Sequence, residues 1–161
     1  DYYNEEILGL KFKVNSFSFF QTNIEAVERL YSEALALIPD LDSKVVYDLY
    51  CGTGTISQLM ASKAKKVYGI EIVQDSVDAA IDNAKMNNID NCHFICGDVK
   101  AKLDEVTEKP DMIVVDPPRM GMHDKVVEML SSYGIEQILY ISCNPNTMAM
   151  RSSRSWGTSR W

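Results

Sequence analysis

Several features that would place this sequence in other protein classes are missing from it. Among its 161 residues, no uncharged apolar run approaches the roughly 20 residues that a membrane-spanning helix requires. The first residues, DYYNEE, lack the basic and apolar character of a secretory signal. No internal repeat and no low-complexity linker interrupts the sequence. These absences favour one globular domain that works in the cytoplasm, away from membranes.

Basic residues are also scarce. Sixteen Lys and Arg residues stand against 23 Asp and Glu residues, which gives a net charge of -7. Because affinity for phosphate comes mostly from Lys and Arg, a chain this acidic is a poor nucleic-acid binder by itself. We therefore expect that a further part of the protein would hold any polynucleotide substrate.

Cysteine occurs at only four positions: Cys51, Cys92, Cys96 and Cys143. In a reducing compartment these residues are expected to be free thiols. The segment from Cys92 to Cys96 also contains His93, which could suggest zinc. On a strand, however, the two cysteines point to one face and His93 to the other, and no second ligand pair completes a site. No metal is predicted.

Short runs rich in Val, Ile, Leu and Tyr alternate with helical patterns over most of the chain. Strands are expected at Val45–Tyr50, Lys66–Ile72, Cys92–Cys96, Met112–Asp116 and Gln137–Ser142. Helices are expected at Gln21–Ile38, Ile56–Lys63, Gln74–Met86 and His123–Ser132. This alternation predicts an α/β fold with a mainly parallel, doubly wound sheet. A short hairpin within Ile7–Phe20, turning at Asn15-Ser16, is expected before it.

The composition changes abruptly at Arg151. From there the chain reads RSSRSWGTSRW, with no acidic residue and no hydrophobic periodicity. We interpret residues 151–161 as a non-native or disordered tail and residues 1–150 as the domain. The sheet is then expected to lack its last strands.

A glycine-rich loop follows the first of the central strands. Gly52 and Gly54 allow a sharp turn and a close approach of a ligand at the start of a helix. Ser57 stands where a dinucleotide-binding fold has its third glycine. Asp48, beside this loop, would repel a pyrophosphate and attract a cation. The loop therefore favours S-adenosylmethionine, which carries a sulfonium and an ammonium group, over NAD.

Two further acids end the next two strands. Glu71 is placed to accept the ribose hydroxyls of a nucleoside, and Asp98 to reach an adenine amino group. The alternative for each acid is that it caps the following helix.

Two later strand ends carry candidate catalytic groups. The fourth strand runs into Asp116-Pro117-Pro118-Arg119, and the fifth into Ser142-Cys143-Asn144-Pro145. In an open parallel sheet these ends can face one cleft. Cys143 is therefore a candidate nucleophile, although a buried structural role is the alternative.

Three motifs together resemble those of the RNA uracil C5-methyltransferases: DLYCGTGT at 48–55, DPPRMG at 116–121 and SCNPNT at 142–147. The resemblance extends from about Phe17 to Met150. It implies a Rossmann-like class I methyltransferase fold and S-adenosylmethionine as cofactor. It also implies methyl transfer to C5 of a uridine in RNA, with 23S ribosomal RNA as the foremost substrate and transfer RNA as the other.

The resemblance also implies roles for individual residues. Cys143 matches the nucleophile, which adds to C6 of uracil, and Asp116 would position the uracil edge or the cofactor. Thr55 stands where relatives often have Asn. The positions that match the cofactor pocket are Gln21, Tyr50, Gly52, Gly54, Thr55, Glu71, Asp98 and Asp116.

Two departures from the family are visible. The glutamate that removes the C5 proton in the family follows the SCNP motif, and residues 151–161 contain no acid. Nothing in the sequence corresponds to the N-terminal RNA-binding region, where some relatives hold an iron–sulfur cluster. The chain is therefore expected to be a catalytic-domain fragment that binds cofactor and turns over poorly.

Three other functions stay open at this point. A methyltransferase acting on an exocyclic amine would need no thiol, but such enzymes favour an aromatic residue where Arg119 stands. A cofactor-binding RNA module without catalysis would form no covalent adduct. A dehydrogenase is disfavoured by Asp48 and Ser57.

Overall fold

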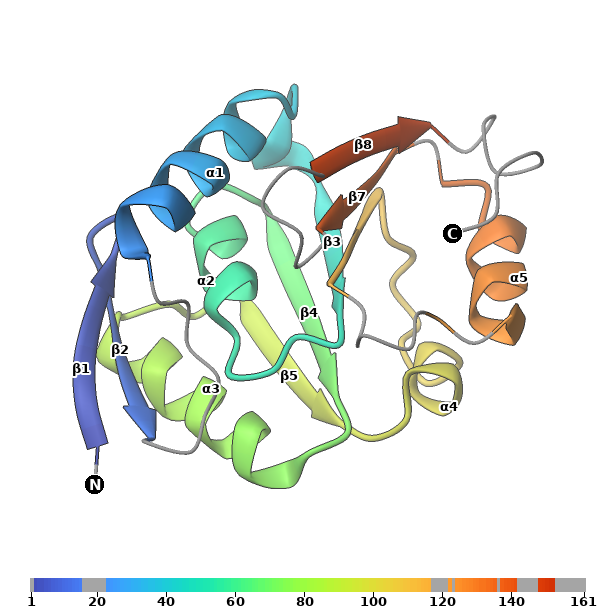
Figure 1. The fold of residues 1–161 in the computed structure, drawn as a ribbon. Coiled ribbons are helices and arrows are strands. Elements are labelled where there is room, and N and C mark those ends of the chain that lie inside the picture. The colour runs from blue at the N-terminus through green and yellow to red at the C-terminus, as the bar shows by residue number, and fades with distance from the viewer. Residues whose placement is uncertain are drawn as a thin grey trace.

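A six-stranded sheet with the order β5-β4-β3-β6-β7-β8 forms the centre of the molecule (Figure 1). The computed structural model describes residues 2–15, 23–116, 122, 124–135, 137–141 and 148–152. Five parallel strands are followed by one antiparallel strand, β8. The strands are β3 (Val45–Leu49), β4 (Lys66–Glu71), β5 (Cys92–Cys96), β6 (Met112–Val115), β7 (Gln137–Ile141) and β8 (Met148–Ser152). This arrangement confirms the predicted α/β class.

Helices cover both faces of the sheet (Figure 1). They are α1 (Ile24–Ala36), α2 (Thr55–Ala61), α3 (Gln74–Met86), α4 (Val99–Leu103) and α5 (Asp124–Ser132), with a short 3-10 helix at Leu41–Ser43. Val46 of β3 packs in the core beneath α1 and α2, whereas Val45, Tyr47 and Leu49 pack in the core beneath α4 and α5. None of the helices in the described part of the chain has both the length and the apolar character that crossing a bilayer demands.

The antiparallel hairpin of β1 (Tyr2–Ile7) and β2 (Leu10–Asn15) lies outside the main sheet. A hairpin was predicted here, but its turn was misplaced. The chain turns at Leu8-Gly9, where both residues have positive φ angles of 49° and 82°. Such a two-residue turn matches the twist of the flanking strands. The sequence signal was hidden because Leu8 is an unusual residue for a left-handed conformation.

The helix α4 and the strand β8 are among the elements that were not predicted. The helix α4 spans only five residues, too few for a helical period to be visible. The strand β8 pairs antiparallel with β7, and its register places Arg151 opposite Ile138 and Ser152 opposite Gln137. The first two residues of the segment interpreted as a tail therefore take part in the sheet. That residues 1–150 form the domain stays a prediction.

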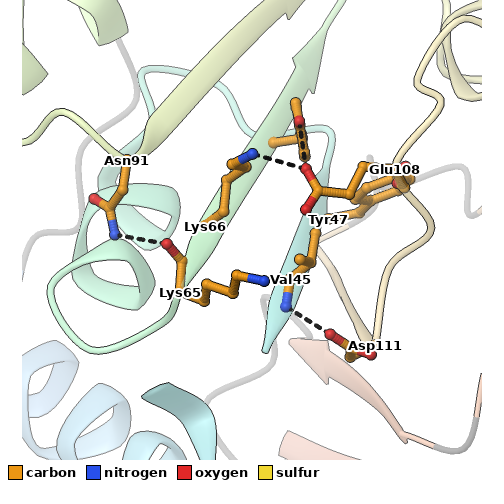
Figure 2. A network of polar contacts seen from close by, with 8 residues as sticks. Val45, Tyr47, Lys65, Lys66, Asn91, Glu108 and Asp111 are labelled. Carbon is orange, nitrogen blue, oxygen red and sulfur yellow. Dashed lines mark hydrogen bonds and ion pairs between the residues drawn. The ribbon is translucent and has the colours of Figure 1, made fainter. Parts of the chain in front are cut away.

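Polar contacts fix the amino ends of the strands (Figure 2). The ammonium of Lys66 on β4 lies 2.8 Å from the carboxylate of Glu108, and the amide of Val45 donates to Asp111 at 2.8 Å. The Tyr47 hydroxyl donates to the main-chain carbonyl of Glu108. These contacts join the connection before β6 to β3 and β4. Structural contacts thus lie at the amino ends of the strands, opposite the carboxyl ends, where open α/β sheets bind their ligands.

The hairpin is held to α3 by two asparagine side chains. Asn87 accepts from the Lys11 amide and donates to the Lys11 carbonyl, both at 2.8 Å. One turn earlier, Asn83 accepts from the Lys13 amide at 2.9 Å. Residues four apart on a helix rise about 6 Å and residues two apart on a strand about 7 Å, so the two spacings match. The side-chain amides of Asn83 and Asn87 therefore bind backbone groups of β2 that a neighbouring strand would otherwise pair with.

We predict that Asn87→Ala lowers the free energy of unfolding by about 1–2 kcal/mol, because the two hydrogen bonds to Lys11 and the one to the side-chain oxygen of buried Gln58 are lost. Urea denaturation followed by circular dichroism measures this difference. Asp82→Ala, at an exposed position of the same helix, is the matched control and should change stability little. Equal effects of the two substitutions would contradict the role assigned to Asn87.

Candidate active site

The predicted site residues that the structure describes lie together at the carboxyl ends of four parallel strands. Leu49 pairs with Ile70 on one side and with Val115 on the other. Tyr50, Glu71 and Asp116, which follow these residues, therefore emerge at the same level, and Asp98 follows the end of β5. Gln21, Cys143 and the segment 117–121 lie outside the described residues.

The glycine loop between β3 and α2 turns through left-handed backbone conformations. Tyr50, Gly52 and Gly54 have φ angles of 61°, 54° and 77°. A Cβ atom on Gly54 would lie 2.7 Å from the ring of Phe94, so a side chain has no room there. Within the described part of the chain, no atom lies within 4 Å of a Cβ built on Gly52. Gly52 therefore borders open space, as the close approach of a ligand requires.

Tyr50 is the residue in this loop that is not suited to its conformation. A left-handed conformation costs a residue with a side chain about 1–3 kcal/mol and persists where the surroundings enforce it. Burial, followed by the negative charge of Asp98, raises the pKa of the Tyr50 hydroxyl. The charge of Asp98, which follows β5, therefore acts on the hydroxyl of the strained Tyr50.

Glu71 joins the glycine loop to the end of β4. One carboxylate oxygen accepts from the Gly52 amide at 2.9 Å and the other from the Val73 amide at 3.0 Å. Each carboxylate oxygen can accept more than one hydrogen bond, so this carboxylate can also receive a pair of hydroxyl groups. The role predicted for Glu71, acceptor of ribose hydroxyls, is compatible with this geometry.

Asp98 caps the helix that follows it, which was the alternative role predicted for this residue. Its carboxylate accepts from the Ala101 amide at 3.2 Å and caps α4. The side chain is exposed at the edge of the site. Capping uses one oxygen for that bond, so it does not exclude a ligand contact through the other.

Asp48 is fully buried beneath the glycine loop. Its Oδ2 accepts from the Ser57 hydroxyl at 2.5 Å, and its Oδ1 has no hydrogen-bond partner among the described residues. Burial raises the pKa of Asp48 to about 7, and the charges of Asp116 and Glu71 add to the effect, although the bond from Ser57 opposes it. Burial likewise raises the pKa of Asp116 to about 6. These crowded carboxyl groups favour a positively charged ligand.

The role of Ser57 was missed by the sequence analysis, which noted only a missing glycine. Ser57 is fully buried, and its hydroxyl donates to the fully buried carboxyl group of Asp48. No local sequence pattern predicts the Asp48–Ser57 pair, because the two residues belong to different elements. Phe94 and Ala80, which close around Gly54, were missed for the same reason.

Burial makes two of the four cysteines unsuitable as nucleophiles. It raises the pKa of the Cys51 thiol well above its ordinary value, and the pKa of Cys92 is raised in the same way. In both cases the charge of Asp48 adds to the effect. A thiol that stays protonated is a poor nucleophile. Among the described residues, no group of three or more potential ligands is placed to hold a metal ion.

Residues 6–154 match the family described as tRNA (Uracil-5-)-methyltransferase. The chain belongs to this family. Uncharacterized RNA methyltransferases of Clostridium acetobutylicum and of Caldanaerobacter subterraneus subsp. tengcongensis are both 51% identical to it over 92% of its length. The chain spans only 32% and 33% of these two proteins. The chain therefore corresponds to about a third of the length of these relatives.

Solved structures agree with the family. A tRNA (uracil-54, C5)-methyltransferase of Pyrococcus abyssi, in complex with S-adenosyl-L-homocysteine, is 29% identical with a TM-score of 0.76. The similarity covers 89% of this chain and 35% of that protein. A putative methyltransferase of Escherichia coli, 19% identical with a TM-score of 0.66, shares the fold over 86% of this chain and 80% of its own. The class I methyltransferase fold implied by the sequence motifs is confirmed.

The buried carboxyl of Asp48 predicts a specific pH dependence of stability. Its pKa rises from 3.8 to about 7 on folding, so the folded state binds the proton more tightly than the unfolded state. Below pH 4 this difference stabilises the folded state by up to about 4 kcal/mol. The stabilisation is lost as the pH rises from 4 through 7. Urea denaturation between pH 4 and 8 should show a steeper loss for the wild type than for Asp48→Asn. Asp82→Asn should keep the wild-type slope, and equal slopes for all three proteins would contradict the prediction.

Proposed function

We propose that this chain binds S-adenosylmethionine at the carboxyl ends of the parallel strands and transfers its methyl group to C5 of a uridine in RNA. The observation that carries the proposal is the placement of Gly52, Glu71, Asp48 and Asp116 at the ends of three adjacent strands. Membership of the uracil-5-methyltransferase family supports the same chemistry.

The residues present fit this cofactor better than a dinucleotide. The Glu71 carboxylate has acceptor capacity for the ribose hydroxyls, and open space lies beside Gly52. A pyrophosphate would meet the carboxyl groups of Glu71 and Asp116 at the strand ends and would be repelled. The cationic groups of S-adenosylmethionine would be attracted by the same carboxyls.

The remaining cofactor positions follow from the family resemblance. Tyr50 and Thr55 would line the loop, Asp98 would receive the adenine amino group, and Gln21 would add a contact from the segment before α1. Asp116 would serve both the cofactor and the uracil edge, because it stands between the glycine loop and the end of β7. When bound, the cofactor supplies an electrophilic methyl group.

Cys143 is proposed as the nucleophile. It follows β7 by two residues in the chain, and β7 is the neighbour of the strand that ends at Asp116. The Cys143 thiolate would add to C6 of uracil, forming a carbon–sulfur bond and an enolate whose C5 can accept the methyl group. A base then removes the C5 proton, and the carbon–sulfur bond breaks to release Cys143. The target base must leave its stack to reach this edge.

We propose 23S ribosomal RNA in the cytoplasm as the substrate. Transfer RNA is the alternative, favoured by the description of the family and by the Pyrococcus abyssi neighbour. Since the chain carries a net charge of -7, further parts of a longer protein would supply most of the grip on RNA. Transcripts of the two RNAs, offered in parallel to such a protein, distinguish the substrates.

Calorimetric titration of the chain with S-adenosylmethionine, and with NAD in parallel, tests the cofactor. Binding of the first ligand alone is expected. Glu71→Gln should weaken it about 10- to 100-fold, because hydrogen bonds to a charged acceptor contribute about 1.5–3 kcal/mol. Asp82→Asn is the control for the loss of one negative charge. Binding of NAD alone would refute the proposed cofactor.

RNA containing 5-fluorouridine tests the nucleophile. Fluorine replaces the C5 proton that the base must remove, so the covalent adduct cannot break down and is trapped. With S-adenosylmethionine present, the wild type should form a complex with RNA that survives denaturing electrophoresis. Cys143→Ala should form none, whereas Cys96→Ala, which removes the thiol at the end of β5, should behave as the wild type. RNA methylation that persists in Cys143→Ala would instead indicate an exocyclic-amine methyltransferase, and cofactor binding without any wild-type adduct would indicate a non-catalytic module.

A further inference from the structure

The buried carboxyl of Asp48 is not explained by packing alone. Asp48 alternates along β3 with residues that face α4 and α5, so its side chain points under α2. No part of it is exposed to solvent, and Oδ1 has no hydrogen-bond partner among the described residues. A buried anion with an unpartnered oxygen is costly. In the free protein the neutral acid is therefore favoured.

Among the described residues, the groups that interact with Asp48 come from α2, the glycine loop and three other strands. Ser57 faces it from α2, the Cys51 thiol from the glycine loop and the Cys92 thiol from β5. The carboxyls of Glu71 and Asp116 act on it from the ends of β4 and β6. None of these five groups is a cation, so none of them stabilises the ionised form of Asp48 by charge.

We infer that Asp48 couples the charge of the ligand to the release of a proton: it holds a proton in the free protein and releases it to solvent when a positively charged ligand binds at the strand ends. The inference rests on the proposed function. The O–H bond of the acid breaks, the carboxylate keeps the electron pair, and the Ser57 hydroxyl continues to donate to Oδ2. No oxidation or reduction accompanies this step.

Electrostatic coupling at the strand ends supports this inference. The negative charges of Glu71 and Asp116 reach Asp48 and hold back its ionisation. A cation bound at the same edge acts through the same environment with the opposite sign, so it promotes ionisation. S-adenosylmethionine carries a sulfonium and an ammonium group, whereas S-adenosylhomocysteine lacks the methyl group on sulfur, has a neutral sulfur and keeps the ammonium group. Asp48 would thus respond more strongly to S-adenosylmethionine, which carries the larger positive charge.

The expected signature is a proton released on binding. With half of Asp48 protonated near pH 7, binding of S-adenosylmethionine at pH 7 should release about half a proton through this residue. Affinity through the same residue should rise about tenfold between pH 6 and pH 8. S-adenosylhomocysteine, which lacks the sulfonium charge, should show smaller effects through Asp48.

Calorimetry in two buffers of different ionisation enthalpy measures the protons exchanged. The wild type and Asp48→Asn are titrated with each ligand at pH 7. The amino group of the ligand titrates equally with both proteins, so the difference between them isolates Asp48. Ser57→Ala is the second variant: it removes a hydrogen bond to the carboxylate and should move the midpoint of the pH profile upward.

Carbon-13 NMR of the Asp48 carboxyl in the wild-type protein gives an answer that needs no variant. The signal should titrate near pH 7 in the free protein and remain that of the ionised form above pH 5 in the S-adenosylmethionine complex. If the ligand binds with equal proton release by wild type and Asp48→Asn, or if the NMR titration is the same with and without ligand, the inference is wrong and the proposed function stands. If S-adenosylmethionine does not bind at all, the proposed function itself fails and the inference falls with it.

Discussion

The site depends above all on the position of β3 in the sheet. This strand is buried along its whole length and pairs with β4 on one side and β6 on the other, so the strand order reverses at its edge. In open α/β sheets, such a reversal leaves a crevice at the carboxyl ends, because the following helices lie on opposite faces. The glycine loop, Glu71 and Asp116 belong to the same crevice only because the register of three strands aligns them.

A fully buried strand also explains the electrostatics of the site. The residue before Leu49 is an aspartate in a position that the fold would otherwise fill with an apolar residue. Its charge is unfavourable there, and one hydroxyl from Ser57 compensates it in part. The fold accepts this cost at the point where a ligand would meet the sheet, which is where strained and poorly satisfied groups concentrate in proteins.

The main features of the fold could be predicted from the sequence because βαβ units have strong local signals. The strand at Cys92–Cys96 and the helix at Gln74–Met86 have the predicted bounds, and other boundaries differ by a few residues. The Leu8-Gly9 turn and β8 were not found, since the first uses an unusual residue and the second depends on pairing with β7. Candidate site residues such as Glu71 could be located because strand ends are visible in the pattern. Ser57 and Phe94 could not, because their roles arise from contacts between elements distant in the chain.

The attachment of the hairpin to α3 has a consequence for the synthesis of the protein. Lys11 is bound by Asn87, a residue 76 positions later, and an isolated two-stranded hairpin is marginally stable in water. The hairpin is translated before α3, yet its partner helix exists only after α3 has been made and has packed on the sheet. The hairpin thus reaches its final place only after a segment that lies well beyond it in the chain. During translation, the nascent chain carries an uncovered strand edge until residue 87 has emerged.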